Sequence, residues 1–396
     1  MVVAVHTIGS IGEWSGGPAR TVTGLCDSIA KQGCSVDLIS GHDVRRDGAL
    51  VLPSELTHLH LIKSLGIPWV RLYPGFCNKV RAVVDRRRAQ EGSECVVHDH
   101  GIWGLTNISA ALASWRASIP YILHPRGMLE PWALQYKAAK KKYAWAIYQR
   151  RIIENSALLI ATSQQELSSI KQLFHHTPVA VIPNGVVAPS AYPDRSKRSR
   201  QDRGKVLFMS RIHPKKNLIG LIQAWNIVCR IPSRNRWILQ IAGPDELGHT
   251  NEIRSLANDL GLDSRIEFLG PIADNQKSAL LDAADVFVLP SFSENFGVVV
   301  AEALAHGLPV VATRGSPWSE LSERGCGWWV DSNPQALAEA LGDATDLDTS
   351  VRCAMGNLGY EYVRIAFSWD RIGSRMIQAY EWVLRHAVTT PSFIYP

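Results

Sequence analysis

The chain has 396 residues, of which 46% are hydrophobic and 20% are charged. At roughly 100–200 residues per domain, this length favours two domains, and the composition is ordinary for a globular protein. No apolar run approaches the length of about 18 residues that a transmembrane helix needs, so we expect none. The seven cysteines form no CxxC pair and are odd in number. They indicate free thiols in a reducing cytosol and argue against a disulfide framework or a structural zinc site.

The first half of the chain alternates short apolar runs with helical segments. Residues 1–9 are apolar and β-branched, lack the basic start of a signal peptide, and predict a buried strand. Residues 19–33 have the apolar spacing of a helix. Four further apolar runs end in polar residues or glycine, at 35–41, 95–101, 120–127 and 157–163. This alternation predicts a parallel sheet that is buried on both faces.

A glycine-rich loop, residues 12–21, joins the first predicted strand to the first helix. Its glycines do not match GxGxxG, which argues against a nicotinamide dinucleotide. Gly16 and Gly17 would let backbone N–H groups approach a ligand beside a helix N-terminus, or they simply form a turn.

Two histidines, His98 and His100, end the predicted strand at 95–101. In an extended chain both side chains point to the same side. They could ligate a metal, serve the structure, or present one imidazole to a cleft, neutral or charged near pH 7. His100 is the better candidate for the last role, because it is closer to the loop.

The formal net charge is +6, and part of the excess falls in residues 137–151, KAAKKKYAWAIYQRR. This segment is threaded with Tyr143, Trp145 and Tyr148. It fits a solvated helix face, a helix lying on an anionic membrane surface, or a nucleic-acid contact. No nucleic-acid-binding motif accompanies it, so we expect no nucleic-acid partner.

Residues 187–205 are rich in proline, serine and charge and predict a surface linker. The strand and helix alternation then starts again, and a last helix over 368–387 has an apolar stripe typical of core contact. The stripe consists of Ile372, Met376, Tyr380 and Val383, and the new strand candidates are 206–210, 237–243, 266–270, 286–291 and 309–313. The sequence thus predicts an α/β protein with two Rossmann-like, doubly wound domains that face each other across a cleft, with ligands at the carboxyl ends of the strands.

Two cations follow the strand predicted at 206–210. Arg211 and Lys216 lie five residues apart across a tight turn that contains Pro214. An arginine fork and a lysine charge near a helix N-terminus suit a diphosphate, whereas the plainer interpretation is two solvated surface cations. The glycines of a Walker A loop are missing.

Glu294 and Glu302 flank the apolar stretch VVVA within 291–313. We expect Glu294 in a loop before Gly297, and Glu302 about a turn and a half into the next helix. A carboxylate accepts hydrogen bonds from paired hydroxyls, so the two could hold the sugar and the ribose of one elongated ligand. A general acid and base pair is the rival interpretation, which the apolar setting of Glu302 disfavours.

Several of these stretches together resemble the family 4 glycosyltransferases, retaining enzymes of the GT-B fold that use nucleotide-sugar donors. The resemblance is dense over 204–330, through SRIHPKKN, IAGPD, FLGPI and ADVFVLPSFSENFGVVVAEALAHGLPVVAT, and a YEWVL helix closes the pattern. It is looser over 1–190, where it rests on SGGPA, HDHG, HPRGML, ATSQQE and IPNGV. PRGML with PWAL is similar to the polysaccharide-building members.

The resemblance implies roles for the charged residues. Glu294 would contact hydroxyls of the donor sugar, and Glu302 would contact the ribose. Arg211 and Lys216 would hold the donor diphosphate, and His100 would lie beside the donor sugar. Arg126 and Asn184 are candidates on the acceptor side. Further donor contacts, largely through backbone atoms, are expected at Gly16, Gly17, Gly243, Gly270, Pro271, Asn295, Phe296 and Gly297.

The resemblance also implies domains and an activity. We expect an acceptor-binding domain over 1–190, a linker over 191–204, a nucleotide-sugar-binding domain over 205–370, and a helix in 371–396 that returns to the first domain. The implied reaction moves a hexose from a UDP- or GDP-sugar to a glycan or lipid-linked acceptor in surface polysaccharide biosynthesis. It needs no cofactor and no metal. We expect a cytoplasmic protein, and one interpretation of residues 137–151 adds peripheral contact with an anionic membrane on the cytoplasmic face. The alternatives are a nucleotide-sugar 2-epimerase on the same fold and a non-catalytic nucleotide-sugar binding protein.

Overall fold

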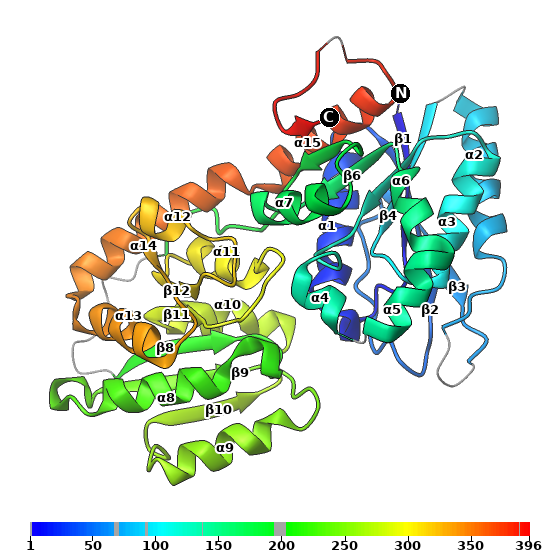
Figure 1. The fold of residues 1–396 in the computed structure, drawn as a ribbon. Coiled ribbons are helices and arrows are strands. Elements are labelled where there is room, and N and C mark those ends of the chain that lie inside the picture. Colours follow the sequence, from blue (N-terminus) through cyan, green and yellow to red (C-terminus); the bar gives the residue numbers. More distant parts are fainter. Residues whose placement is uncertain (1, 67–70, 92–93, 137, 194–202, 388) are drawn as a thin grey trace. The chain divides into compact units, whose positions relative to one another are not determined.

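The computed structural model describes residues 2–66, 71–91, 94–136, 138–193, 203–387 and 389–396. The chain forms two compact units, one of Met1–Gly185 with Trp369–Pro396 and one of Val186–Ser368 (Figure 1). Each unit is built on one mainly parallel sheet with helices, as the sequence predicts. All seven cysteines are free thiols.

The first unit has the strand order β14-β7-β6-β5-β4-β1-β2-β3, in which β14 runs antiparallel to β7. Its strands are β1 (Val2–Ile8), β2 (Ser35–His42), β3 (Thr57–Lys63), β4 (Glu94–His100), β5 (Tyr121–His124), β6 (Leu158–Ala161), β7 (Val179–Val181) and β14 (Ile394–Tyr395). Its helices are α1 (Gly17–Lys31), α2 (Phe76–Glu91), α3 (Leu105–Arg116), α4 (Pro131–Gln135), α5 (Ala138–Ala144), α6 (Arg150–Glu154), α7 (Gln164–Leu173) and α15 (Trp369–Val383), with the short turns η1 (Glu13–Ser15) and η2 (Trp145–Gln149).

Strand residues of the first unit pack alternately into two cores, because successive side chains of a strand point to opposite faces. Val3 and Val97 belong to the core that contains residues of α2 and α3. Ala4 and Val96 belong to the core that α1 and α15 cover, and these two helices lie side by side (Figure 1). The stripe of the last helix faces this second core, which confirms its predicted packing role.

The second unit has the strand order β10-β9-β8-β11-β12-β13, with every pair parallel. Its strands are β8 (Gly204–Met209), β9 (Trp237–Ala242), β10 (Ile266–Gly270), β11 (Val286–Leu289), β12 (Val310–Thr313) and β13 (Gly327–Val330). Its helices are α8 (Leu218–Cys229), α9 (His249–Asp259), α10 (Asp274–Ala283), α11 (Val298–Ala305), α12 (Glu320–Glu323), α13 (Pro334–Asp346) and α14 (Thr349–Ala366), with the short turns η3 (Pro214–Lys216) and η4 (Pro232–Arg234).

Every predicted strand is present, and four strands are additional: β3, β7, β13 and β14. Each lacks the signal of a buried parallel strand. β7 and β14 are only three and two residues long, and β3 is half-buried or exposed at every position after its first residue. The residues of β13 are half-buried after its first glycine.

The units divide at residues other than the predicted limits. The second unit begins at Val186, whose N–H donates to the Phe367 carbonyl at 2.9 Å. Tyr192, inside the predicted linker, belongs to this unit, and its hydroxyl donates to the Cys353 carbonyl at 2.9 Å. Residues 194–202 of the linker lie outside the described residues.

The basic segment is not one regular helix. It comprises α5, the π-helical turn η2 and the start of α6, and residue 137 lies outside the described residues. Tyr143 is 72% exposed, but Trp145 packs on Trp103 with ring centroids 6.0 Å apart, and the Tyr148 hydroxyl donates to the Trp103 carbonyl. Two of the three aromatic side chains of the basic segment, Trp145 and Tyr148, therefore face the interior of the unit. No helix in the described part of the chain has the length and apolar character to cross a bilayer.

The indole of Trp369, at the start of α15, lies between two glycines. A Cβ added at Gly24 of α1 would be 2.5 Å from this indole, and one added at Gly185 would be 2.4 Å from it. Both glycines therefore allow the start of α15 to pack closely on α1 and on the chain at Gly185.

Gly24→Ala should lower the free energy of unfolding by about 1–3 kcal/mol, the usual cost of forcing an extra carbon into a packed contact. Denaturant unfolding followed by circular dichroism measures the change. Gly17→Ala is the matched control in the same helix, because a Cβ there meets no atom within 4 Å, and it should be neutral or slightly stabilising. Equal stability of the two variants would contradict this packing.

Candidate active site

The ends of β8 and β11 bring Lys216 and Glu294 together. These strands are neighbours in the sheet, and η3 and the loop after β11 follow them. The Lys216 ammonium donates to Oε1 of Glu294, and both side chains are largely buried, with 11% and 12% of their surface exposed. Ser291 Oγ donates to the same carboxylate oxygen at 2.6 Å. The result is a shielded ion pair at the carboxyl edge of the sheet.

Glu294 stays ionised in this setting. Burial by itself raises the pKa of the carboxyl group, but the charge of Lys216 and the hydrogen bonds from Lys216 and Ser291 outweigh burial and hold the pKa below its ordinary value. Backbone contacts also support this loop, because the Glu294 N–H donates to the Gly315 carbonyl at 2.7 Å. An ionised, anchored carboxylate is a ready acceptor for hydroxyl groups.

Arg211 does not share this ion pair. Its guanidinium is 60% exposed and donates to Glu246 at 2.8 Å. The two predicted diphosphate ligands therefore have different acidic partners in this structure. The exposed pair of Arg211 and Glu246 contributes little to stability, so the arginine can exchange its partner for an anion at small cost.

Glu302 lies on α11, which begins after Gly297, as the spacing predicts. Its side chain is 26% exposed, and Lys277 Nζ of α10 lies 3.9 Å from Oε1. Oε2 is buried and has no hydrogen-bond partner among the described residues. A buried carboxylate oxygen without a donor favours a ligand that supplies one.

The loop between the two glutamates is held by an aromatic side chain. Trp318 Nε1 donates to the Phe296 carbonyl at 2.5 Å, and the two rings pack with centroids 5.4 Å apart. Gly297 has φ of 73°, a conformation that favours glycine. The Phe296 carbonyl is thus used within the protein. At the start of α11 the Val300 N–H donates to the Gly297 carbonyl at 2.8 Å, and the N–H groups of the two helical residues before Val300 come too early to have an acceptor inside the helix.

Gly243, Gly270 and Pro271 lie together at the ends of β9 and β10. The Gly243 N–H donates to the Gly270 carbonyl at 2.7 Å. A Cβ at Gly243 would be 1.8 Å from the carbonyl oxygen of Ser210, so packing alone requires this glycine. Pro271 is exposed beside them.

Gly16 and Gly17 begin α1 in the first unit. Gly16 has φ of 68°, and Gly17 is the first helical residue. A Cβ added at either position meets no atom within 4 Å. Packing therefore does not explain why residue 17 is glycine. The close approach of a ligand to its backbone stays a prediction.

His100 is part of a buried polar cluster in the first unit. His98 and His100 both point to one face of β4, as predicted, where they meet His6 of β1. His100 is only 3% exposed, and both of its ring nitrogens have partners: Nε2 lies 2.9 Å from His6 Nδ1, and Nδ1 lies 3.1 Å from Arg126 Nη2. Burial, neighbouring imidazoles and Arg126 hold the pKa of His100 well below its ordinary value, so the ring is neutral rather than charged near pH 7.

The acceptor-side candidates lie in the same unit. Arg126 follows β5 with φ of 55°, which is unusual for a residue with a side chain, and it contacts His100. Burial lowers its pKa to about 10, so it remains positively charged at neutral pH. Asn184 is buried, with 9% of its surface exposed, just before Gly185.

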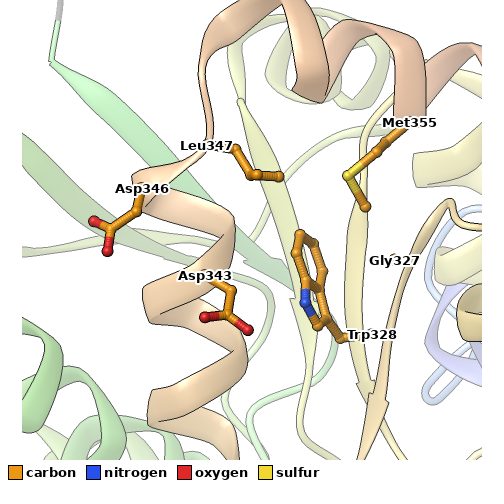
Figure 2. A pocket seen from close by; sticks show the side chains of 6 residues that line it. All are labelled: Gly327, Trp328, Asp343, Asp346, Leu347 and Met355. Atoms are coloured by element: carbon orange, nitrogen blue, oxygen red, sulfur yellow. The ribbon is translucent and has the colours of Figure 1, made fainter.

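The second unit also has a hollow that none of the predicted site residues lines. It is lined by Gly327, Trp328, Asp343, Asp346, Leu347 and Met355, with both aspartates on α13 (Figure 2). None of the predicted site residues lines it, and Asp346 is bound by Arg234 at 2.5 Å. The hollow therefore shares no residue with the candidate active site.

Sequence reasoning missed four partners in the second unit: Ser291, Glu246, Lys277 and Trp318. Ser291 lies three residues before Glu294, so its proximity to this glutamate was available from the sequence. The other three come from separate loops and helices and reach the site only through the fold.

Comparison with known proteins gives the family. The model of "Glycosyl transferases group 1" matches residues 193–361, and the "Glycosyl transferase 4-like domain" matches residues 16–185. The chain is 27% identical over 395 residues to the D-inositol 3-phosphate glycosyltransferase of Corynebacterium glutamicum, covering 92% of this chain and 91% of the relative. It is 31% identical over 282 residues to the protein of that name from Corynebacterium efficiens, covering 67% and 66% of the two chains.

Solved structures confirm the fold. Sucrose-phosphate synthase from Thermosynechococcus elongatus superimposes with a TM-score of 0.76 at 21% identity, covering 98% of this chain and all (100%) of that one. Anabaena Alr3699/HepE in complex with UDP and glucose gives a TM-score of 0.70 at 19% identity, covering 96% of this chain and 100% of the other. Since two glycosyltransferase models match the greater part of both units, the chain belongs to the group 1 glycosyltransferases of the GT-B fold and is a glycosyltransferase enzyme.

Proposed function

We propose that this enzyme transfers a hexose from a UDP- or GDP-sugar to a glycan or lipid-linked glycan, with retention of the anomeric configuration, in surface polysaccharide biosynthesis. The observation that carries the proposal is the shielded pair of Lys216 and Glu294 at the ends of β8 and β11. The fold is shared with Anabaena HepE, whose solved complexes contain UDP with glucose and UDP-glucose.

In the proposed reaction a nucleoside diphosphate leaves the sugar, and negative charge grows on its phosphate. Lys216 and Arg211 stabilise this charge, and Glu294 accepts hydrogen bonds from the sugar hydroxyls. Such preorganised electrostatic contacts are usually the largest contribution to catalysis. The leaving phosphate accepts the proton of the attacking hydroxyl. The reaction uses no cofactor and no metal, because side chains supply the positive charge.

The remaining candidates hold the two substrates. Glu302 binds the ribose through the oxygen that lacks a partner within the described chain. Gly17 brings its backbone to the phosphates, and the ends of β9 and β10 hold the base. Arg126 and Asn184 serve the acceptor side. The epimerase and the non-catalytic binding protein lose support, because the matching family models are those of glycosyltransferases.

A second acceptor class is favoured by the relatives, which are named D-inositol 3-phosphate glycosyltransferases. A phosphorylated cyclitol would place an anion on the acceptor side, where Arg126 is charged.

A nucleotide-release assay tests the function. UDP- and GDP-hexoses are offered with a glycan, a lipid-linked glycan, inositol 3-phosphate or no acceptor. We expect acceptor-dependent release from one nucleotide class, and the anomeric proton of the product, read by NMR, should show retention. Release that never depends on an acceptor, across the whole panel, would contradict the transfer.

Glu294→Gln and Lys216→Ala should each lower turnover by at least about tenfold, because each removes a contact of the reacting donor. The same assay measures turnover, and thermal unfolding checks the fold. Glu361→Gln is the matched control, since Glu361 forms an exposed pair with Arg364 in the same unit. A folded Lys216→Ala protein with the rate of the control would remove the diphosphate role.

We also propose that the enzyme is cytoplasmic and that the basic segment lies on an anionic membrane face. Tyr143 is 72% exposed and Ile147 is 77% exposed among the lysines of this segment. Nearby, Trp132 of α4 and Tyr136, the residue after this helix, stack with ring centroids 5.7 Å apart and are exposed. Outward apolar side chains beside lysines are typical of interfacial helices.

Sedimentation with liposomes tests this contact. The wild type should bind vesicles with anionic lipid and not neutral ones, and the double variant Tyr143→Ser, Ile147→Ser should lose most of this binding, since it removes the apolar contact. The control double variant Val351→Ser, Ile365→Ser changes exposed apolar residues of the second unit. Equal binding of the wild type to neutral and anionic vesicles, or an equal loss of vesicle binding in the control variant, would contradict the proposal.

A further inference from the structure

A chain of hydrogen bonds runs through the buried face of the first unit. His100 Nε2 lies 2.9 Å from His6 Nδ1, and His6 Nε2 lies 3.1 Å from the Tyr380 hydroxyl. The same hydroxyl lies 2.8 Å from His98 Nδ1. The chain therefore joins β4, β1 and α15, and all its members are at most 3% exposed.

Arg126 determines the direction of this chain. Its Nη2 and Nε lie 3.1 Å and 3.4 Å from His100 Nδ1. A guanidinium carries donors and no acceptor, so Nδ1 of His100 must be the acceptor and must be unprotonated. A neutral imidazole has one proton, so that proton is on Nε2.

The other protons follow in sequence. The Nε2–H of His100 donates to His6 Nδ1, which places the His6 proton on Nε2. That proton is donated to the Tyr380 oxygen, so the Tyr380 hydroxyl donates to His98 Nδ1. His98 then carries its proton on Nε2, where the chain ends, because this nitrogen has no partner in the described part of the protein. Burial lowers the pKa of His6 to about 3, in agreement with neutral rings.

Arg126 is itself held in place. Its Nη1 donates to Thr21 Oγ1 of α1 at 2.8 Å, and the N–H of the next residue, Gly127, donates to the buried Glu166 at 2.5 Å. The contacts to His100 are longer than the roughly 2.7–2.9 Å of a strong charge-assisted hydrogen bond. Arg126 thus orients the ring without binding its lone pair tightly.

We propose that Arg126, His6 and Tyr380 are positioning residues that keep His100 neutral with Nδ1 unprotonated, so that this nitrogen accepts a hydrogen bond from a hydroxyl of the donor sugar in place of Arg126. The proposal rests on the proposed function for its substrate, while the protonation pattern belongs to the free protein. Tyr380 couples the last helix of the protein to His100 through His6, since its hydroxyl lies between His6 and His98 in the hydrogen-bond chain.

A metal ion is the competing occupant of this cluster. His6, His98 and His100 offer ligand atoms within 4.8 Å of one another. The charge of Arg126 beside His100 opposes a cation there, and a bound metal would take the lone pairs that the hydrogen bonds use. Metal analysis of the purified protein should therefore find less than one equivalent of bound metal. One equivalent of zinc, in a protein whose histidines do not show the predicted protonation, would overturn the proposal.

Nitrogen-15 NMR of protein labelled at histidine tests the protonation pattern directly. At pH 7 the rings of His6, His98 and His100 should be neutral and protonated on Nε2, with single-histidine variants giving the assignments. Arg126→Met removes the donor that keeps Nδ1 of His100 unprotonated. Histidine rings protonated on Nδ1 should then appear in the spectrum. A wild-type His100 that is protonated on Nδ1, or on both nitrogens, would overturn the proposal whether or not the enzyme is active on any donor.

Kinetics test the positioning role. Tyr380→Phe removes one hydroxyl and should lower kcat by about tenfold, the effect of losing one hydrogen bond of typical strength, with UDP or GDP affinity unchanged. Tyr360→Phe is the matched control, because Tyr360 is a buried tyrosine whose hydroxyl donates to the Pro189 carbonyl at 2.9 Å. Equal kcat of the two folded variants would reject the positioning role. If the wild type acts on no nucleotide sugar, the proposed function fails, and the nitrogen-15 result still decides the hydrogen-bond chain.

Discussion

The candidate site depends on one constraint, which is that parallel strands buried on both faces satisfy their backbone groups inside the sheet. Groups that can bind a ligand therefore gather where the strands end. In the second unit, Lys216 follows β8, Glu294 follows β11, and Gly243 and Gly270 lie at the ends of β9 and β10. The strand order places these four ends at one edge of one sheet. Residues from distant parts of the sequence thereby come within reach of a single elongated ligand.

The two clusters of candidate residues use buried polar groups differently. At the ends of β8 and β11, Lys216 and Glu294 form a buried pair of opposite charges. A buried ion pair is weak evidence for stability, because desolvation of two charges offsets their attraction. Under the proposed function, the pair serves a donor that uses both charges.

In the first unit the buried polar groups on the β1 and β4 face are neutral imidazoles. Desolvation removes their charge, and hydrogen bonds to one another satisfy most of their nitrogens. Arg126 is the charged member at the end of this cluster. Because a guanidinium can only donate, one side chain determines where the protons of several others lie. A lysine ammonium also only donates, but it loses its proton more readily when buried and lacks the planar fork of a guanidinium, so the arginine is the stronger constraint.

The sequence by itself determined the α/β class, the alternation of strands and helices, and the position of Glu302 about one and a half turns into its helix. These features depend on periodicity and on glycines within a few residues, which are local properties of the chain. The family was also visible from local motifs. The inward packing of Trp145 and Tyr148 could not be predicted from the sequence, because residue spacing alone does not say which face of an irregular helix meets a core.

Only the tertiary structure decided which groups touch. Lys216 and Glu294 are 78 residues apart, and Tyr380 and His6 are 374 residues apart. The fold gives Arg211 and Lys216 different acidic partners, and it leaves a buried oxygen of Glu302 without a partner in the described chain. It also joins His98 and His100 of one strand in a directed hydrogen-bond chain. The physical reason is that strand order and helix packing set these contacts, and neither is encoded in the spacing of residues along a single segment.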